Sequence, residues 1–217
     1  MYKNVIFDLD GTLLNTLEDL AAATNWVCAL HGWPAHTVEE YKYFVGNGAP
    51  KLLERVAPPG TVLTDELRRV TLEEFTERYN AHKEDRTTAY PGMPEAVRRL
   101  RDAGITLAVL SNKPHEAARP VVERYFPGLF HRVQGALPDV PVKPDPTLLH
   151  RLMEELGASP ADTLFVGDSS VDIRTARNGG LVSCGVLWGF RTRQELEAEG
   201  ADYIVETAQE LAELILK

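Results

Sequence analysis

The chain is 217 residues long, has a formal net charge of −9 at pH 7 and contains two cysteines, Cys28 and Cys184. This length allows one or two domains. The acidic balance argues against a nucleic-acid or acidic-membrane surface, and cysteines this far apart give little support to a disulfide framework or a zinc site. No segment is apolar over the roughly 18 residues of a membrane span. Asp8 also interrupts the N-terminal stretch where a signal peptide would need a continuous apolar run. We therefore expect a cytoplasmic protein, monomeric or homodimeric, that binds neither nucleic acid nor membranes.

Residues 4–16 begin with a short apolar run that ends in two carboxylates, Asp8 and Asp10. The β-branched and aromatic residues at positions 5–7 predict a buried strand, so both charges lie at its carboxyl end. Acids this close repel each other by roughly 1 to 4 kcal/mol, a cost that a cation or a shared proton relieves. A divalent metal is the economical explanation; the alternative is an Asp-Gly turn that merely ends the strand.

A mostly helical insert follows, from about residue 15 to residue 87. Apolar residues recur at helical spacing up to a stop at Gly32 and Pro34, and breaks rich in glycine or proline separate the later helices. Thr64 precedes acids in the first turn of the last helix, as capping and the helix dipole favour. The expected helices cover residues 17–30, 38–44, 49–56 and 65–79.

From residue 90 onward, predicted strands alternate with predicted helices. The strands are expected at residues 105–110, 131–134, 163–167, 181–187 and 202–205. The helices are expected at residues 94–103, 115–125, 145–156, 170–178 and from 207. This alternation predicts parallel strands joined by helical crossovers. We therefore expect an α/β fold in which a Rossmann-like parallel-sheet core, residues 1–14 and 88–217, is interrupted by a helical cap domain, residues 15–87.

Three further polar motifs follow the first. They are Ser111-Asn112-Lys113-Pro114, Val142-Lys143-Pro144-Asp145-Pro146 and Gly167-Asp168-Ser169-Ser170-Val171-Asp172. Ligands of open α/β sheets bind beyond the carboxyl ends of the strands, where the first, second and fourth motifs fall. In order and spacing, the four motifs resemble those of the haloacid dehalogenase superfamily of phosphotransferases over nearly the whole chain. The chain is most similar to phosphoglycolate phosphatases and their near neighbours, through Gly46-Asn47-Gly48-Ala49-Pro50, Tyr90-Pro91-Gly92 and Gly185-Val186-Leu187-Trp188-Gly189-Phe190.

This resemblance implies chemistry at phosphorus. Asp8 matches the superfamily nucleophile, which forms an aspartyl-phosphate, and Asp10 matches the general acid and base. Relatives that break carbon–halogen or carbon–phosphorus bonds lack an acid at the position of Asp10, so its presence favours phosphate esters. The implied cofactor is Mg²⁺, held by Asp8, Asp168 and the backbone carbonyl of Asp10. Asp172 would act through a metal-bound water or orient its neighbours; alternatively it is a first-turn helix acid.

Several side chains are implied partners of the phosphoryl group. Lys143 would neutralise the nucleophile and the transferring phosphoryl group; the alternative is a surface lysine in a proline-rich loop. Thr12 and Ser111 would hold phosphoryl oxygens through their hydroxyls, and Asn112 would donate through its amide. Lys113 would bring further positive charge to the substrate, unless it is a solvated lysine at the start of the next helix.

Among small phosphorylated metabolites, the resemblance favours 2-phosphoglycolate, whose carboxylate would need donors from the cap. Lys51 and Arg55 lie one helical turn apart, after the loop Gly46-Asn47-Gly48, whose amides are suited to an anion; a solvated helix face is the alternative. Trp188 is expected in the core rather than against a ligand. The resulting hypothesis is a Mg²⁺-dependent phosphatase. The alternatives are a sugar phosphomutase that uses the same aspartyl-phosphate and a non-catalytic binding protein.

Overall fold

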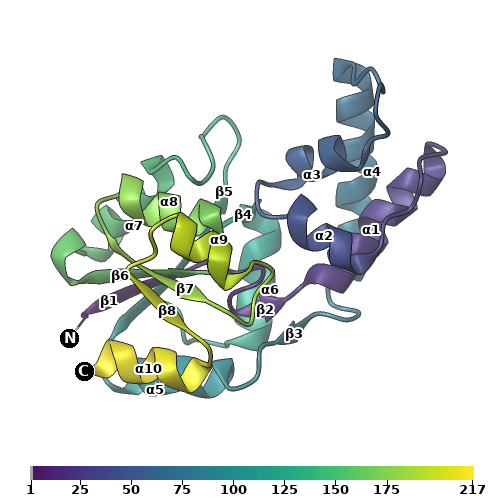
Figure 1. Ribbon diagram of the computed structural model, residues 1–217. Coiled ribbons are helices and arrows are strands. Elements are labelled where there is room, and N and C mark those ends of the chain that lie inside the picture. The colour runs from purple at the N-terminus through teal and green to yellow at the C-terminus, as the bar shows by residue number, and fades with distance from the viewer. Residues whose placement is uncertain (1) are drawn as a thin grey trace. The chain divides into compact units, whose positions relative to one another are not determined.

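The computed structural model describes residues 2–217 and divides them into two compact units. The first unit runs to Asn15 and resumes with Ala89–Lys217, and the second is the insert Thr16–Thr88. The first unit holds a six-stranded sheet in the order β5-β4-β1-β6-β7-β8 (Figure 1). Every neighbouring pair in it is parallel. The strands are β1 (Asn4–Phe7), β4 (Thr106–Pro114), β5 (Arg132–Ala136), β6 (Thr163–Gly167), β7 (Val182–Val186) and β8 (Tyr203–Val205).

All four residues of the central strand β1 are buried, because helices cover both faces of the sheet. Val5 and Phe7 belong to one hydrophobic cluster and Ile6 to another, as the two-residue period of a strand requires. Burial on both faces explains why the segment reads as a continuous apolar run. The predicted Rossmann-like α/β core is confirmed. Its helices are α5 (Met93–Asp102), α6 (His115–Tyr125), α7 (Thr147–Leu156), α8 (Ser170–Asn178), α9 (Arg193–Ala198), α10 (Ala208–Leu216) and the short 3₁₀ helix η1 (Pro160–Asp162).

The register of the sheet brings several strand ends to one edge. Phe7 lies opposite Val109 of β4 and Val166 of β6. The next residue, Asp8, still belongs to the ladder, since its backbone N–H donates to the carbonyl of Val166 at 2.8 Å. Because all three strands run in the same direction, the polar residues that follow them emerge at the same edge.

The structure departs from the predicted elements at a few places. Strand β4 continues to Pro114 rather than ending at residue 110, because after a register shift it pairs again with Ala136 of β5. Helix α7 begins two residues later than predicted, where Asp145 accepts a hydrogen bond from the backbone N–H of Thr147 at 2.9 Å. Two short strands, β2 (Leu14–Asn15) and β3 (Thr88–Ala89), pair in a separate sheet. They were not predicted, since two residues show no periodicity.

The second unit consists of four helices joined by short loops, as the sequence predicts. Helix α2 starts with a capping box in which Thr37 and Glu40 bond each other's backbone N–H groups. Helix α4 continues three residues past the expected end. Cys28 of α1 is buried and free, as is Cys184 of β7, and among the described residues no helix has the length and hydropathy needed to cross a membrane. The helices are α1 (Leu17–Leu30), α2 (Val38–Phe44), α3 (Ala49–Val56) and α4 (Asp65–His82).

The buried carboxylate of Asp19 fixes the end of the second unit to α1. It accepts hydrogen bonds from the backbone N–H of Arg86 at 3.0 and 3.1 Å, and from the N–H and hydroxyl of Thr87 at 2.8 and 2.7 Å. We expect Asp19→Ala to lower the free energy of unfolding by about 2–3 kcal/mol, because it removes the charged acceptor of the buried Thr87 N–H and of the neighbouring donors. Urea unfolding followed by circular dichroism measures this loss.

A neighbouring carboxylate provides the control for Asp19. The Glu18 side chain is 53% exposed and contacts Arg86 at 3.5 Å. Exposed ion pairs contribute little, so Glu18→Ala should change the free energy of unfolding by less than about 1 kcal/mol. Equal effects of the two substitutions would contradict the anchoring role of Asp19.

Candidate active site

A buried lysine joins two of the predicted acids at the carboxyl edge of the sheet. The Nζ atom of Lys143 lies 2.6 Å from Oδ1 of Asp8 and 2.7 Å from Oδ1 of Asp172. Burial alone would lower the pKa of Lys143, but the carboxylates of Asp172 and Asp8 raise it above its ordinary value. Lys143 is therefore a charged group inside the site and not a solvated loop lysine.

The backbone of Lys143 is held in turn by Asn112. The Asn112 amide oxygen accepts a hydrogen bond from the Lys143 N–H at 2.8 Å, and its amide nitrogen donates to the Lys143 carbonyl at 3.0 Å. Sequence reasoning assigned Asn112 to phosphate. The structure places this amide on the loop that carries Lys143, where it positions the lysine.

The carboxylates of Asp8, Asp168 and Asp172 converge next to this lysine. Their candidate ligand atoms all lie within 4.8 Å of one another, and all three residues are buried. Burial raises the pKa of Asp8 to about 7, with the Lys143 ammonium acting in the opposite direction. Burial also raises the pKa of Asp168 well above its ordinary value, and the charges of Asp172 and Asp8 add to this effect. Such a cluster of oxygen donors suits a hard divalent cation.

Asp172 combines two of the roles considered from the sequence. It lies in the first turn of α8, where its Oδ2 accepts hydrogen bonds from the N–H and the hydroxyl of Ser169 at 3.1 and 2.7 Å. Its Oδ1 is the atom that bonds Lys143. Asp172 therefore starts the helix and orients a neighbour in the site, so it fits the expected supporting position.

Asp168 is held by residues 188–190, which belong to a stretch that resembles the family but was not predicted to take part in the site. Its Oδ2 accepts a hydrogen bond from the Phe190 N–H at 2.7 Å. A Cβ atom on Gly189 would lie 2.3 Å from Cβ of Asp168 and 2.4 Å from the carbonyl oxygen of Gly11, so only glycine fits this contact. The Trp188 indole donates to the Thr12 carbonyl at 2.9 Å. These residues thus hold Asp168, a candidate metal ligand, close to the first motif at Thr12.

Two hydroxyls predicted to hold phosphate lie in this part of the fold. The Thr12 hydroxyl is buried and has no hydrogen-bond partner among residues 2–217. A buried hydroxyl without a partner is costly, and a phosphoryl oxygen would satisfy it. The Ser111 hydroxyl accepts a hydrogen bond from the Lys113 N–H at 3.2 Å and remains able to donate its own proton.

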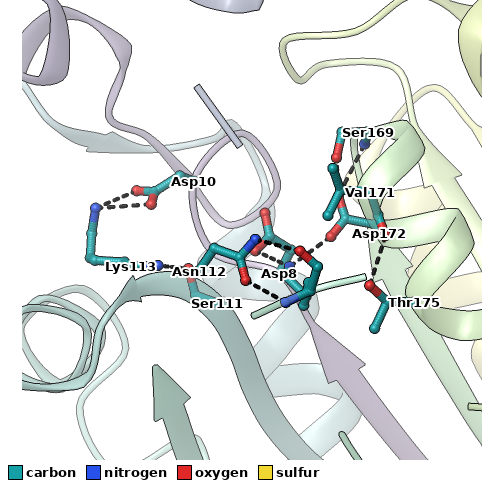
Figure 2. A network of polar contacts seen from close by, with 10 residues as sticks. Asp8, Asp10, Ser111, Asn112, Lys113, Ser169, Val171, Asp172 and Thr175 are labelled. Atoms are coloured by element: carbon teal, nitrogen blue, oxygen red, sulfur yellow. Dashed lines mark hydrogen bonds and ion pairs between the residues drawn. The ribbon is translucent and has the colours of Figure 1, made fainter. Parts of the chain in front are cut away.

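Asp10 forms an ion pair with Lys113 beside this centre. The Lys113 Nζ lies 2.8 Å from Oδ1 and 2.9 Å from Oδ2 of Asp10. The Lys113 side chain is 3% exposed and that of Asp10 is 19% exposed. Figure 2 shows Asp8 between this pair and Asp172. Lys113 lies in β4, one residue before its end, and is buried, so the alternative of a solvated lysine at a helix start is wrong.

The cap residues predicted for specificity bond mainly within the second unit. Lys51 pairs with Glu54 at 2.8 Å on an exposed surface. Arg55 donates to the Phe44 carbonyl and to the Asn47 side chain, both at 2.7 Å, and so connects the loop Gly46-Asn47-Gly48 to α2. Arg55 therefore stabilises the loop, and Gly46 and Gly48, with φ of 108° and 83°, allow its backbone course. Anion binding by these residues stays a prediction.

The chain is similar to known phosphatases over its length. A family model described as haloacid dehalogenase-like hydrolase matches residues 2–180. Phosphoglycolate phosphatases of Vibrio vulnificus and Pseudomonas putida are each 33% identical to it, over 99% and 95% of this chain and 96% and 77% of theirs. A crystal structure from Lactobacillus delbrueckii subsp. bulgaricus, of a protein provisionally described as a phosphoglycolate phosphatase, aligns at 35% identity with a TM-score of 0.90. It covers 99% of this chain and 98% of that one.

Proposed function

Because this chain belongs to the haloacid dehalogenase-like hydrolases and is a phosphoric monoester hydrolase, we propose that it hydrolyses 2-phosphoglycolate with Mg²⁺ through an aspartyl-phosphate on Asp8. The observation that carries the mechanism is the contact of one buried ammonium, Lys143, with both Asp8 and Asp172 at 2.6 and 2.7 Å. Whole-length likeness to phosphoglycolate phosphatases supports the substrate. The inserted helical unit is proposed as the cap that selects the leaving group.

The donor set at the sheet edge fits the proposed cation. Three buried carboxylates lie within 4.8 Å of one another, and their charge exceeds that of Lys143 alone. Asp8 and Asp168, with the backbone carbonyl of Asp10, would hold Mg²⁺, which prefers oxygen ligands and keeps several waters. When bound, the ion would supply positive charge to the phosphoryl oxygens and to the attacking carboxylate.

The proposed reaction takes place in two transfers. An oxygen of Asp8 forms a bond to phosphorus as the bond to the ester oxygen breaks, and Asp10 gives that departing oxygen a proton. Asp10 then takes a proton from a water that attacks phosphorus, which frees phosphate and restores the Asp8 carboxylate. Lys143 neutralises charge on Asp8 and on the phosphoryl group, and Thr12 donates to a phosphoryl oxygen.

A substrate profile of the purified protein tests this function. We expect phosphate release from 2-phosphoglycolate that stops on chelation with EDTA and returns with added Mg²⁺, and that exceeds release from other small monoesters. No release from any ester in the presence of Mg²⁺ would refute the proposal. Isomerisation of a sugar phosphate without net release would favour the phosphomutase alternative instead.

A further inference from the structure

Lys113 is a buried cation that the proposed chemistry leaves without a defined task. Its side chain is 3% exposed, whereas that of its partner Asp10 is 19% exposed. Of the two bonded side chains, Asp10 is therefore the more accessible to solvent, and Lys113 lies beneath it. The backbone of Lys113 is closely packed against β5, because a Cβ atom on Gly135 would lie 2.6 Å from the Lys113 carbonyl oxygen.

The two lysines of the site bond different carboxylates. Lys143 bonds Asp8 and Asp172, and Lys113 bonds both oxygens of Asp10 at 2.8 and 2.9 Å. Figure 2 shows the pair of Asp10 and Lys113 apart from Asp172, with Asp8 between them. Lys143 is therefore suited to bind the transferring phosphoryl group. Lys113 is suited to bind a substrate group that lies next to Asp10.

The group next to Asp10 in the proposed reaction is the leaving group, because Asp10 must contact the ester oxygen. In 2-phosphoglycolate the carbon bonded to that oxygen carries a carboxylate. Like the side chain of Asp10, this substrate carboxylate has two oxygens that can accept hydrogen bonds from the Lys113 ammonium. Among the cations predicted to contact the substrate, Lys113 is the one that bonds Asp10 directly, whereas Lys51 pairs with Glu54 and Arg55 bonds the backbone of α2.

We propose that Lys113 is the specificity residue for a carboxylate attached next to the ester oxygen. This inference rests on the proposed function. The substrate carboxylate binds the Lys113 ammonium, and Asp10, which bonds the same ammonium, is thereby placed against the ester oxygen. A monoester without that carboxylate lacks this contact, so the residue both recognises the substrate and positions Asp10.

A matched pair of substrates tests the role of Lys113. The pair is 2-phosphoglycolate and 2-hydroxyethyl phosphate, in which a hydroxymethyl group replaces the carboxylate. Lys113→Gln should lower kcat/KM about a hundredfold for the first and less than about tenfold for the second, and Lys113→Arg should restore part of the difference. Lys3→Gln is the control, since Lys3 is exposed and pairs with Asp162. Equal losses on both substrates, or no loss on 2-phosphoglycolate, would overturn the inference.

Binding to Asp8→Asn separates this inference from the proposed function. By calorimetry with Mg²⁺, we expect 2-phosphoglycolate to bind this variant at least about tenfold more tightly than 2-hydroxyethyl phosphate, and Lys113→Gln to remove the preference. If Asp8→Asn binds the two esters equally, the role of Lys113 is overturned. This outcome does not require that Lys113→Gln folds. Absence of turnover by the parent protein, with this binding preference intact, refutes the function alone.

Discussion

Asp8→Asn is expected to abolish turnover while leaving the fold at least as stable as the parent. Asparagine cannot attack phosphorus as a carboxylate does, so kcat should fall by at least about a thousandfold. The amide also removes one negative charge from the buried cluster, where burial raises the pKa of Asp8 to about 7, and Lys143 keeps Asp172 as its partner. Phosphate release at saturating substrate and thermal unfolding measure the two effects.

The control for this prediction is a carboxylate at the opposite end of the strands. Asp162 precedes β6 and pairs with the exposed Lys3 at 2.8 Å. Asp162→Asn should therefore keep the parental kcat. Parental activity in Asp8→Asn would exclude Asp8 as the nucleophile. A large loss of stability would show that Lys143 stabilises the Asp8 charge by more than burial and the neighbouring carboxylates destabilise it.

Lys143→Met should destroy both activity and stability, in contrast to Asp8→Asn. Removal of the ammonium leaves Asp8 and Asp172 as buried charges without their cation, which costs about 3–5 kcal/mol. Urea unfolding measures this loss, and phosphate release should fall at least as far as in Asp8→Asn. Comparison of the two variants would thus distinguish the proposed nucleophile, Asp8, from Lys143, which is also expected to stabilise the folded site.

A double substitution measures the interaction between Lys143 and Asp8 directly. Asp8→Asn in the Lys143→Met background removes one of the unpaired charges, so it should recover part of the lost stability but no activity. Strict additivity of the two changes in the free energy of unfolding would contradict a direct interaction between these side chains. Lys42→Met is the matched control, because Lys42 pairs with Glu39 on an exposed helix face.

The fold was predictable where periodicity and breakers were strong. The helices 17–30, 115–125 and 170–178 and the strand 163–167 have the predicted bounds, since apolar spacing and flanking glycine or proline define them locally. The continuation of β4 to Pro114 was not predicted, because it depends on pairing with Ala136 in another strand.

The same distinction applies to the candidate site. The acids after β1 and β6 were found because parallel strands bring their carboxyl ends to one edge. The contacts that support them had no local signal. Asn112 bonds the backbone of Lys143, and Phe190 bonds Asp168, across 31 and 22 residues of sequence. Partners of this kind are chosen by tertiary packing, so a composition or spacing pattern does not reveal them.

The shared contact of Lys143 has a consequence for the timing of turnover. The ammonium rests on Asp172 as well as on Asp8, and Asp172 itself is fixed by Ser169. In the proposed reaction, an oxygen of Asp8 is consumed in a covalent intermediate; the Lys143 ammonium would then keep Asp172 as its partner while water attacks. The second transfer of this proposed reaction would therefore begin with the ammonium already in place.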